Sequence, residues 1–370
     1  MRIPLAAPDL SGNELRYVAE AVQSSWISST GPFVSRFEST FAELCGVRSA
    51  LSVSSGTAAL HLALLALGAG PGDEVIVPSL TYVATANAVR YVGAKPVFVD
   101  IDLSTWCLDP EGVETAFTPR TKGIIAVHLY GHPADMDALA ALADQRGAWV
   151  LEDAAEAHFA TYKGRPVGSL GAMATFSFYG NKPLTCGEGG AVTTSAVRLA
   201  ERARLLRGQG MDPERRYYFS IVGYNYRLTN VACALLCAQL ERRDTLLARR
   251  REIFNLYQEL LDGIPGVEFQ PIAPWAEPTP WLFSVVIDPR RYGRSRDELA
   301  RVLADAGIET RPFFVPLHTL PPYLHSSSQG HPRLPRTEML ASRGMNLPTH
   351  TSLDDRDVAF VADVIRRSHR

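Results

Sequence analysis

The chain has 370 residues, of which 46% are hydrophobic and 21% are charged, and its formal net charge is −2. This composition is typical of a globular protein with a sizeable core and excludes a disordered or fibrous chain; we expect two domains of unequal size. The near-neutral charge excludes an overall basic field that would attract nucleic acid or an anionic membrane.

The cysteines and the N-terminal sequence bear on the compartment. Five cysteines without CxxC spacing favour reduced thiols over a disulfide framework. The first residues lack the basic and then apolar pattern of a signal peptide, and no apolar run is long enough to span a membrane. We therefore expect a cytoplasmic protein.

Short β-branched runs alternate with helical patterns from about residue 49 to residue 195. This rhythm predicts a mainly parallel sheet with helices on both faces, in which ligands bind at the carboxyl ends of the strands. We predict strands at 50–53, 74–77, 96–99, 123–127, 148–151 and 191–194, and helices at 57–67, 82–91 and 135–146.

The pattern then changes to that of a smaller α+β domain. A long helical stretch covers 228–261, and five prolines between residues 265 and 280 mark an irregular connection. A strand at 281–287 and helices at 296–306 and 353–366 follow, and 326–330 is predicted to be a surface loop. We place the large domain, with an N-terminal arm, at 1–245 and the small domain at 246–370.

The segment from Ser54 to Ala59 connects a predicted strand to a predicted helix. Gly56 allows a close approach of the backbone, and the first turn of a helix offers free N–H groups that suit a phosphate. An ordinary capped turn remains the alternative, because Ser and Thr are common N-caps.

Three carboxylates, Glu152, Asp153 and Glu156, lie at the end of a predicted buried strand. Buried carboxylates are costly unless they are paired, so one of them could hold a protonated ring nitrogen. A helix N-terminus enriched in acidic residues is the alternative.

Lysine is rare in this chain, since only four of the 37 basic residues are lysines. Lys95 and Lys122 each precede a strand, and Lys163 lies in a turn. Lys182 instead follows the short apolar strand around Ser177 and lies in a Gly-Asn turn before a Gly-rich segment. A desolvated amine in such a loop can act as a Schiff-base nucleophile.

His128 and His132 have a spacing that on a helix would suggest a metal site. Gly131 and Pro133 predict a loop instead, so we expect no metal. Cys233 and Cys237 share one face of a helix among Ala and Leu, which indicates core positions.

In their joint order and spacing, these motifs resemble the sugar aminotransferases of the DegT/DnrJ/EryC1/StrS family. The resemblance implies the fold type I architecture of pyridoxal-5′-phosphate (PLP) enzymes, which is aspartate aminotransferase-like, with a large α/β domain and a smaller α+β domain. It covers the segments 26–32, 54–59, 78–82, 152–156, 177–182, 223–227, 311–318 and 346–348.

The resemblance also assigns roles to the residues around the cofactor. Lys182 would bind PLP covalently and shuttle the proton, and Asp153 would pair with the pyridinium nitrogen. Tyr82 would stack on the ring, with a core aromatic as the alternative. Gly56, Thr57 and Ser177 would hold the phosphate, and Glu156 would lie near the 3′-oxygen.

Further residues are assigned to the substrate and to a second subunit. Asn225 would reach the phosphate of the neighbouring subunit's cofactor, so the active unit would be a homodimer with shared active sites. Arg311 and His318 would line the substrate side. Phe159 departs from the family, which usually has Gly or a small residue there, and could alter the cofactor pocket or only the following turn.

The motif combination is most similar to the branch that makes GDP-perosamine, which implies GDP-4-keto-6-deoxymannose as amine acceptor and L-glutamate as donor. Another nucleotide-linked ketosugar, including a 3-keto sugar, or an aminocyclitol is the alternative substrate. A non-catalytic subunit with a regulatory or binding role is an alternative from a different class. A strand–GxGxxG–helix unit is missing from the sequence, which argues against an NAD-dependent oxidoreductase.

Overall fold

The computed structural model describes residues 3–324 and 333–370. Within them, the main sheet has seven strands in the order β1-β9-β8-β5-β4-β2-β3. Strands β2, β3, β4, β5 and β8 are parallel to their neighbours in this group, and β9 is antiparallel to both β8 and β1. The strands are β1 (Ser49–Val53), β2 (Glu74–Pro78), β3 (Lys95–Val99), β4 (Thr121–Val127), β5 (Trp149–Asp153), β8 (Met173–Ser177) and β9 (Gly190–Thr194).

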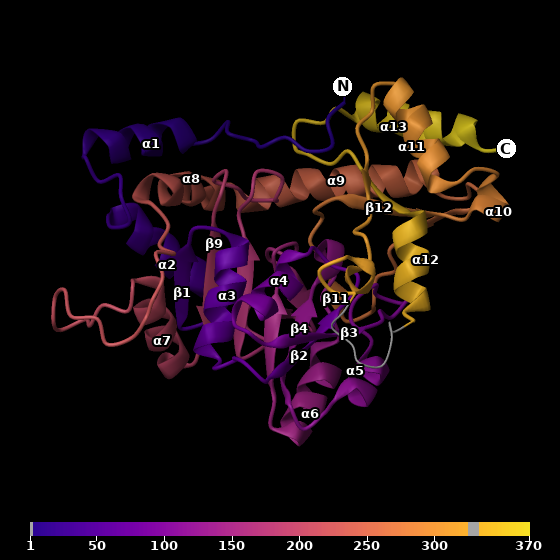
Figure 1. Ribbon diagram of the computed structural model, residues 1–370. Coiled ribbons are helices and arrows are strands. Elements are labelled where there is room, and N and C mark those ends of the chain that lie inside the picture. The colour runs from indigo at the N-terminus through magenta and orange to yellow at the C-terminus, as the bar shows by residue number, and fades with distance from the viewer. Residues whose placement is uncertain (1–2, 325–332) are drawn as a thin grey trace.

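Helices cover both faces of this sheet, as the βαβ pattern predicts (Figure 1). One face carries α3 (Gly56–Ala66), α4 (Ala84–Tyr91) and α7 (Val197–Arg207). The other carries α2 (Pro32–Leu44), α5 (Pro110–Ala116), α6 (Met136–Arg146) and α8 (Asn230–Glu241), and α1 (Glu14–Gln23) packs on α8. Every residue of β2 is buried, which is why its sequence is a continuous apolar run apart from Glu74 at its first position.

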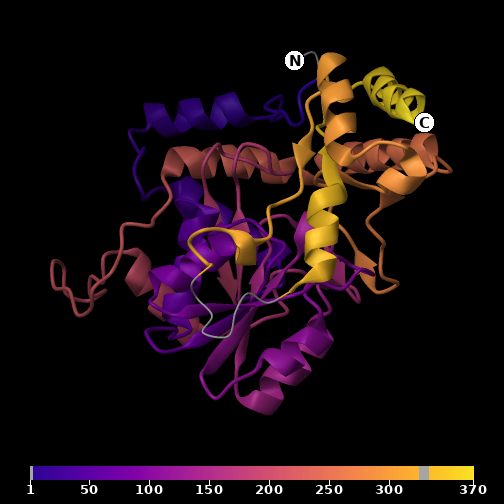
Figure 2. The ribbon, with the colours of Figure 1, turned by 45° about the vertical axis from the view of Figure 1, so that its right-hand side comes forward.

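A second, antiparallel sheet has the order β10-β12-β14-β13 and lies beside the first (Figure 2). A separate hydrophobic core lies between this sheet and its helices. The strands of this sheet are β10 (Val267–Phe269), β12 (Phe283–Ile287), β13 (Arg311–Pro312) and β14 (Gly344–Leu347), and the helices of this part of the chain are α9 (Arg243–Leu261), α10 (Pro289–Tyr292), α11 (Arg296–Asp305), α12 (Pro335–Arg343) and α13 (Asp355–Ser368). Helix α12 differs from the others, because its buried Leu340 and Ala341 belong to the core of the large sheet.

A small third sheet and two single turns of 3₁₀ helix complete the described elements. The sheet has the order β11-β6-β7 and joins the proline-rich connection to the large sheet's loops. These elements are β6 (Thr161–Tyr162), β7 (Arg165–Pro166), β11 (Ala276–Glu277), η1 (Leu129–Gly131) and η2 (Leu317–Thr319).

The helical stretch predicted for 228–261 is confirmed, but it is divided into two helices, α8 and α9, by a break at Arg242 that the sequence did not predict. Arg242 has non-helical backbone angles, φ −107° and ψ 4°. Its guanidinium pairs with Asp9 in the N-terminal segment at 2.9 Å. A tertiary ion pair with a residue 233 positions away therefore holds the break.

The boundary predicted at residue 245 stays a prediction, and it falls in the first turn of α9. The N-terminal segment reaches across it, since Ile3 pairs with Ile308 and belongs to the second core. No helix in the described ranges has the length and apolar character needed to cross a membrane. The predicted loop at 326–330 lies outside the described residues, and the cytoplasmic location remains a prediction.

Candidate active site

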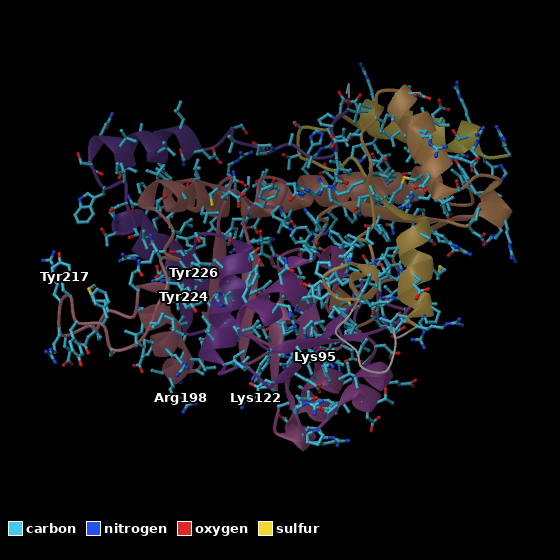
Figure 3. All side chains as sticks on the ribbon, viewed as in Figure 1. Lys95, Lys122, Arg198, Tyr217, Tyr224 and Tyr226 are labelled. Carbon is cyan, nitrogen blue, oxygen red and sulfur yellow. The ribbon has the colours of Figure 1, made fainter. Side chains whose placement is uncertain are left out.

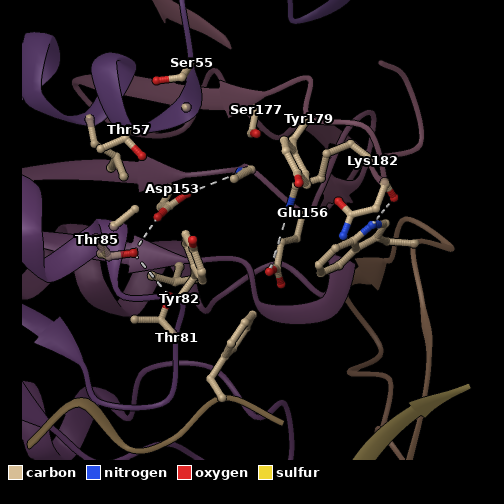
Figure 4. A pocket seen from close by; sticks show the side chains of 18 of the residues that line it. Ser55, Thr57, Thr81, Tyr82, Thr85, Asp153, Glu156, Ser177, Tyr179 and Lys182 are labelled. Atoms are coloured by element: carbon tan, nitrogen blue, oxygen red, sulfur yellow. Dashed lines mark hydrogen bonds and ion pairs between the residues drawn. The ribbon is translucent and has the colours of Figure 1, made fainter. Parts of the chain in front are cut away.

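A cavity of about 640 Å³ opens at the carboxyl ends of the large sheet's strands (Figure 4). Residues from both sheets contribute to it, so it lies where the two cores meet. Its lining consists of Ser55, Gly56, Thr57, Leu60, Thr81, Tyr82, Ala84, Thr85, Val127, Asp153, Ala155, Glu156, Ser177, Tyr179, Asn181, Lys182, Glu188, Trp281, Arg311 and Phe314.

One end of the cavity is the N-terminus of α3. The Ser55 side chain caps this helix by accepting the Ala58 N–H at 3.1 Å. Among the described residues, no acceptor bonds the backbone N–H of Gly56 or Thr57, so both are available to a ligand. A Cβ on Gly56 would lie 2.8 Å from the Cβ of Ser177, so only glycine fits there. The close approach of Ser177 brings its hydroxyl to the same end, which makes an anion cradle.

Asp153 is the last residue of β5 and is only 6% exposed. The Thr85 hydroxyl donates to its Oδ2 at 2.8 Å, and the Ala155 N–H donates to its Oδ1 at 3.3 Å. Burial raises the pKa of this carboxyl, because the charged form loses its hydration. A protonated ring nitrogen placed beside it would supply the missing charge partner.

Lys182 and Glu156 form a buried pair, with 4.0 Å between Nζ and Oε1. Burial lowers the pKa of the Lys182 amine, and the two nearby carboxylates, Glu156 and Asp153, act against this shift. Burial raises the pKa of Glu156, whose Oε2 accepts the Tyr130 N–H at 2.7 Å. The neutral amine needed for a nucleophile is therefore easier to reach here than on an exposed lysine.

The loop that carries Lys182 is held by its own backbone. The Lys182 N–H donates to Tyr179 O at 2.9 Å, and the Phe178 N–H donates to Gly189 O at 2.8 Å. The Trp281 indole N–H donates to Asn181 O at 2.8 Å. These bonds fix the start of the lysine side chain next to the cavity.

The mouth of the cavity is aromatic. Tyr82 is 58% exposed and lies two residues before α4, and its ring centroid is 5.8 Å from that of Phe314. An exposed ring at the mouth disfavours the alternative that Tyr82 is a core aromatic, and it is available to stack on a planar ligand.

The structure brings most of the predicted site residues together. Eight of the ten line the cavity, namely Gly56, Thr57, Tyr82, Asp153, Glu156, Ser177, Lys182 and Arg311. The remaining two, Asn225 and His318, are not part of this lining.

His318 is buried and does not line the cavity. One ring nitrogen, Nδ1, lies 2.7 Å from the Ser79 hydroxyl, and Nε2 lies 3.2 Å from Glu338. Both nitrogens are thus used within the fold, and the cavity geometry gives the predicted substrate role of His318 no support.

Asn225 lies on the loop between α7 and α8, which projects from the body of the molecule (Figure 1). The neighbouring rings of Tyr224 and Tyr226 stack at 5.1 Å between centroids and pack against His61 on α3. This anchors the base of the loop, while Tyr217 lies at its far end (Figure 3).

The other lysines lie away from the cavity. Lys95 begins β3 and Lys122 is the second residue of β4, which places both at the amino ends of strands (Figure 3). Lys163 is exposed and pairs with Asp137 at 2.7 Å. Of the four lysines, all of which are described, Lys182 alone lines the cavity.

The two histidines with HxxxH spacing serve the fold. The His128 ring bonds Glu152 through Nε2 at 3.1 Å, and the His132 Nε2 accepts the Ala273 N–H at 3.1 Å. No cluster of three potential metal ligands occurs among the described residues. Cys233 and Cys237 are buried, which confirms their prediction as core residues.

Phe159 does not line the cavity. It adopts a left-handed backbone conformation, with φ 64°, and its ring lies 6.2 Å from Phe41 and 5.8 Å from the Arg243 guanidinium. A left-handed position favours glycine, so the departure at Phe159 concerns the turn after β5 rather than the pocket.

Sequence reasoning missed Thr85 and Trp281. Thr85 lies on α4 one turn after Thr81 and carries no motif, although its hydroxyl bonds Asp153. Trp281 appeared only as the first residue of a predicted strand, whereas β12 starts at Phe283. Neither residue had a local signal, because each acquires its role from a distant part of the chain.

The cavity thus combines an anion cradle, a buried carboxylate and a buried amine. This donor set fits a cofactor with a phosphate, a basic ring nitrogen and a carbonyl that an amine can attack. Two observations support this fit. Only glycine fits at position 56, and among the described residues the first N–H groups of α3 have no acceptor, so a phosphate can bind there.

The sequence is similar to those of known proteins over almost the whole chain. The DegT/DnrJ/EryC1/StrS aminotransferase family matches residues 8–366. GDP-perosamine synthase of Caulobacter vibrioides is 49% identical over 358 residues, which are 96% of this chain and 95% of that protein.

Solved structures agree with this match. DesV of S. venezuelae, in complex with a ketimine intermediate, has a TM-score of 0.89 and 41% identity, covering 97% of this chain and 95% of that one. Spr1654 of Streptococcus pneumoniae in its PLP form has a TM-score of 0.91 and 29% identity, covering 100% and 98%. The predicted fold class is confirmed.

Proposed function

Because the chain belongs to the DegT/DnrJ/EryC1/StrS aminotransferase family, and is thus a PLP-dependent aminotransferase, we propose that it aminates a GDP-linked ketosugar. The donor is L-glutamate, the acceptor is GDP-4-keto-6-deoxymannose and the product is GDP-perosamine. The similarity to the Caulobacter GDP-perosamine synthase supports this choice of sugar and nucleotide.

The observation that carries the proposal is the buried amine of Lys182, 4.0 Å from Glu156 and in the same cavity as Asp153. In this proposal Lys182 bonds the cofactor and then moves the proton between the carbons of the cofactor and of the substrate. Burial lowers the pKa of this amine, which helps because the amine must alternate between neutral and charged forms.

The other cavity residues hold PLP, which acts as the electron sink of the reaction when bound. The N–H groups of Gly56 and Thr57, with the Ser177 hydroxyl, bind its phosphate. Asp153 pairs with the ring nitrogen and keeps it protonated, and Tyr82 stacks on the ring. In this assignment Glu156 lies beside the ring oxygen.

Arg311 binds the amino donor in this proposal. Arg311 lines the cavity, and its charge acts to lower the pKa of the nearby Glu156 carboxyl, although among the described residues no carboxylate lies within 4.0 Å of it. A free guanidinium can bind a carboxylate through two parallel hydrogen bonds, which suits L-glutamate.

The active unit in this proposal is a homodimer in which Asn225 binds the phosphate in the partner's site. The loop that carries Asn225 exposes several large apolar side chains, including Tyr217, Phe219 and Val222. Exposed apolar groups in one segment are typical of an interface.

Mixing Lys182→Ala subunits with Asn225→Ala subunits tests whether the active sites are shared, because a mixed dimer has one intact site. Roughly a quarter of wild-type activity should return after random exchange, and no recovery contradicts sharing.

The substrate is tested with a panel of nucleotide ketosugars. The enzyme is incubated with L-glutamate and with GDP-, dTDP- or UDP-linked 4-keto-6-deoxy sugars, a 3-keto sugar or a keto-cyclitol, and products are identified by mass spectrometry. Amination of the GDP sugar alone supports the proposal. Activity restricted to another sugar or to a cyclitol contradicts this substrate and leaves the aminotransferase chemistry intact.

The role of Lys182 is tested with matched lysine variants. Lys182→Ala and Lys182→Arg should lose turnover and the visible absorbance of the bound cofactor, whereas Lys163→Ala, at an exposed lysine, should keep both. Normal transamination by Lys182→Ala contradicts the mechanism. A wild-type protein whose absorbance does not respond to glutamate would instead favour a non-catalytic subunit.

A further inference from the structure

Trp281 connects the second sheet to the lysine loop. It lies two residues before β12, is 2% exposed and lines the cavity. The Lys182 Nζ is 3.9 Å from the centroid of its ring. Its indole N–H donates to the carbonyl of Asn181, the residue before Lys182, at 2.8 Å. One side chain therefore contacts both the amine and the backbone that carries it.

The position of Trp281 is itself fixed by its neighbours. The backbone N–H of Trp281 donates to Thr279 O at 2.8 Å, and the backbone carbonyl of Trp281 accepts from the Arg250 guanidinium at 2.8 Å. Arg250 is a buried residue of α9. The indole ring stacks on Tyr130 at 6.3 Å between centroids with an angle of 26°. The indole therefore has little freedom to move away from Lys182.

Burial disfavours the charged form of the Lys182 amine, so the groups that face it decide how readily it holds a proton. The carboxylates of Glu156 and Asp153 stabilise the ammonium, whereas Arg311 opposes it. His158, also buried nearby, is the remaining titratable group that interacts with the amine. The face of an indole ring attracts a cation, and the attraction is strongest where water is excluded.

We propose that Trp281 is a positioning residue for Lys182, because its ring face holds the ammonium form and its N–H fixes the backbone of the lysine loop. When the amine accepts a proton from a carbon acid it becomes an ammonium, and it later returns this proton to another carbon. Trp281 stabilises the amine while it carries the proton and keeps it within the cavity. This role rests on the proposed function of Lys182 as the amine that reacts.

The protonation of Lys182 is measured directly by competitive labelling. The full-length protein is treated with acetic anhydride over a range of pH, both without cofactor and in the holoenzyme after excess glutamate, and the acetylated peptides are quantified by mass spectrometry. With only four lysines in the chain, Lys95, Lys122 and Lys163 serve as internal references. The pH dependence of labelling gives the pKa of Lys182.

Trp281→Leu removes the ring and the N–H, and it should lower the pKa of Lys182 by about one unit, a tenfold gain in neutral amine. Trp281→Phe keeps a ring, and its shift should be less than half as large. Glu156→Gln, which removes a carboxylate without a change of shape, should also lower the pKa. The acidic limb of the pH profile of kcat should shift by the same amount as the pKa of Lys182 measured by labelling, while the KM for glutamate stays within about twofold.

An unchanged or raised pKa in Trp281→Leu overturns the proposal, and so does an equal shift in Trp281→Phe. Trp281→Met replaces the leucine variant if that variant does not fold, which thermal unfolding and the three reference lysines show. Labelling of the cofactor-free chain does not depend on catalysis. A wild-type protein whose cofactor is not bound to Lys182 would contradict the proposed function, while the pKa comparison would still test Trp281.

Discussion

The two walls of the cavity differ in chemistry and in origin. The sheet wall, made of Gly56, Asp153, Ser177 and Lys182, comes from two strand ends, the loop after β8 and the first residue of α3. The C-terminal wall, made of Trp281, Arg311 and Phe314, comes from the second sheet and its connections. The sheet wall supplies the amine, the carboxylate and the anion cradle, whereas the C-terminal wall supplies rings and the guanidinium of Arg311.

This difference indicates that the sheet wall carries out the chemistry and the C-terminal wall recognises the substrate. Groups that exchange protons or hold charge on a cofactor must be fixed to within a fraction of an ångström, and buried strand ends provide this rigidity. The C-terminal wall closes the cavity and contacts what enters it. Changes in the sheet wall should therefore mainly lower kcat, and changes in the C-terminal wall should mainly alter substrate binding and the environment of Lys182.

The largest effect should come from Asp153→Asn in the sheet wall. The amide keeps the shape but cannot keep a ring nitrogen protonated, so we expect kcat to fall by about a thousandfold. The cofactor-free variant should be at least as stable as wild type, because it no longer buries a carboxylate whose pKa burial raises. Steady-state kinetics and thermal unfolding measure the two effects. Asp137→Asn, at an exposed position, is the control, and an unchanged kcat would contradict the assignment.

The contact between the two regions should weaken in acid, because His132 accepts the Ala273 N–H of the connection. Burial lowers the pKa of His132 from 6.5 to about 4, so its stabilising contribution is complete above pH 6.5 and is lost as the pH falls through about 4. By this linkage the free energy of unfolding should fall by about 3 kcal/mol between pH 6.5 and pH 4. Urea unfolding at several pH values should show a shallower loss for His132→Gln than for wild type, and an identical loss would show that His132 is not responsible.

In the C-terminal wall, Arg311→Lys should raise the KM for glutamate by about tenfold and leave kcat within about threefold, because a lysine cannot form the two parallel bonds to a carboxylate. Arg301→Lys, at an exposed position of α11, should behave like wild type. A fall in kcat with an unchanged KM would place Arg311 with the chemistry and would break the comparison between the walls.

The smallest effect should come from Phe159→Gly, next to the sheet wall but outside the cavity. Glycine relieves about 1 kcal/mol of left-handed strain and loses about 2 kcal/mol of ring packing, so the variant should be less stable by about 1 kcal/mol. Cofactor affinity and turnover should stay within about twofold. Urea unfolding and absorbance titration measure these quantities, and a large change in cofactor affinity would mean that Phe159 shapes the pocket after all.

The sheet wall was largely predictable because its signals are local. A strand, a turn and a helix start occur within a dozen residues around Gly56, whereas Asp153 ends β5 and Lys182 lies in the loop that follows β8. The break at Arg242 within the helical stretch 228–261 was not predicted, because helical periodicity continues through it and its ion pair with Asp9 is a tertiary contact. The family resemblance assigned His318 to the substrate side, but the local sequence does not indicate whether its ring is exposed. In the structure the ring is hydrogen-bonded to Ser79 and Glu338.

The sequence by itself determined the class of fold, the rarity of lysine and the loop in which Lys182 lies, since these follow from backbone periodicity and from which residues tolerate a turn. The tertiary structure alone decided that Trp281, 99 positions after Lys182, covers its amine, and that Arg311 rather than His318 faces the cavity. The reason is that contacts between distant segments depend on the order of the strands and on the packing of one core against another. No local pattern encodes these two properties.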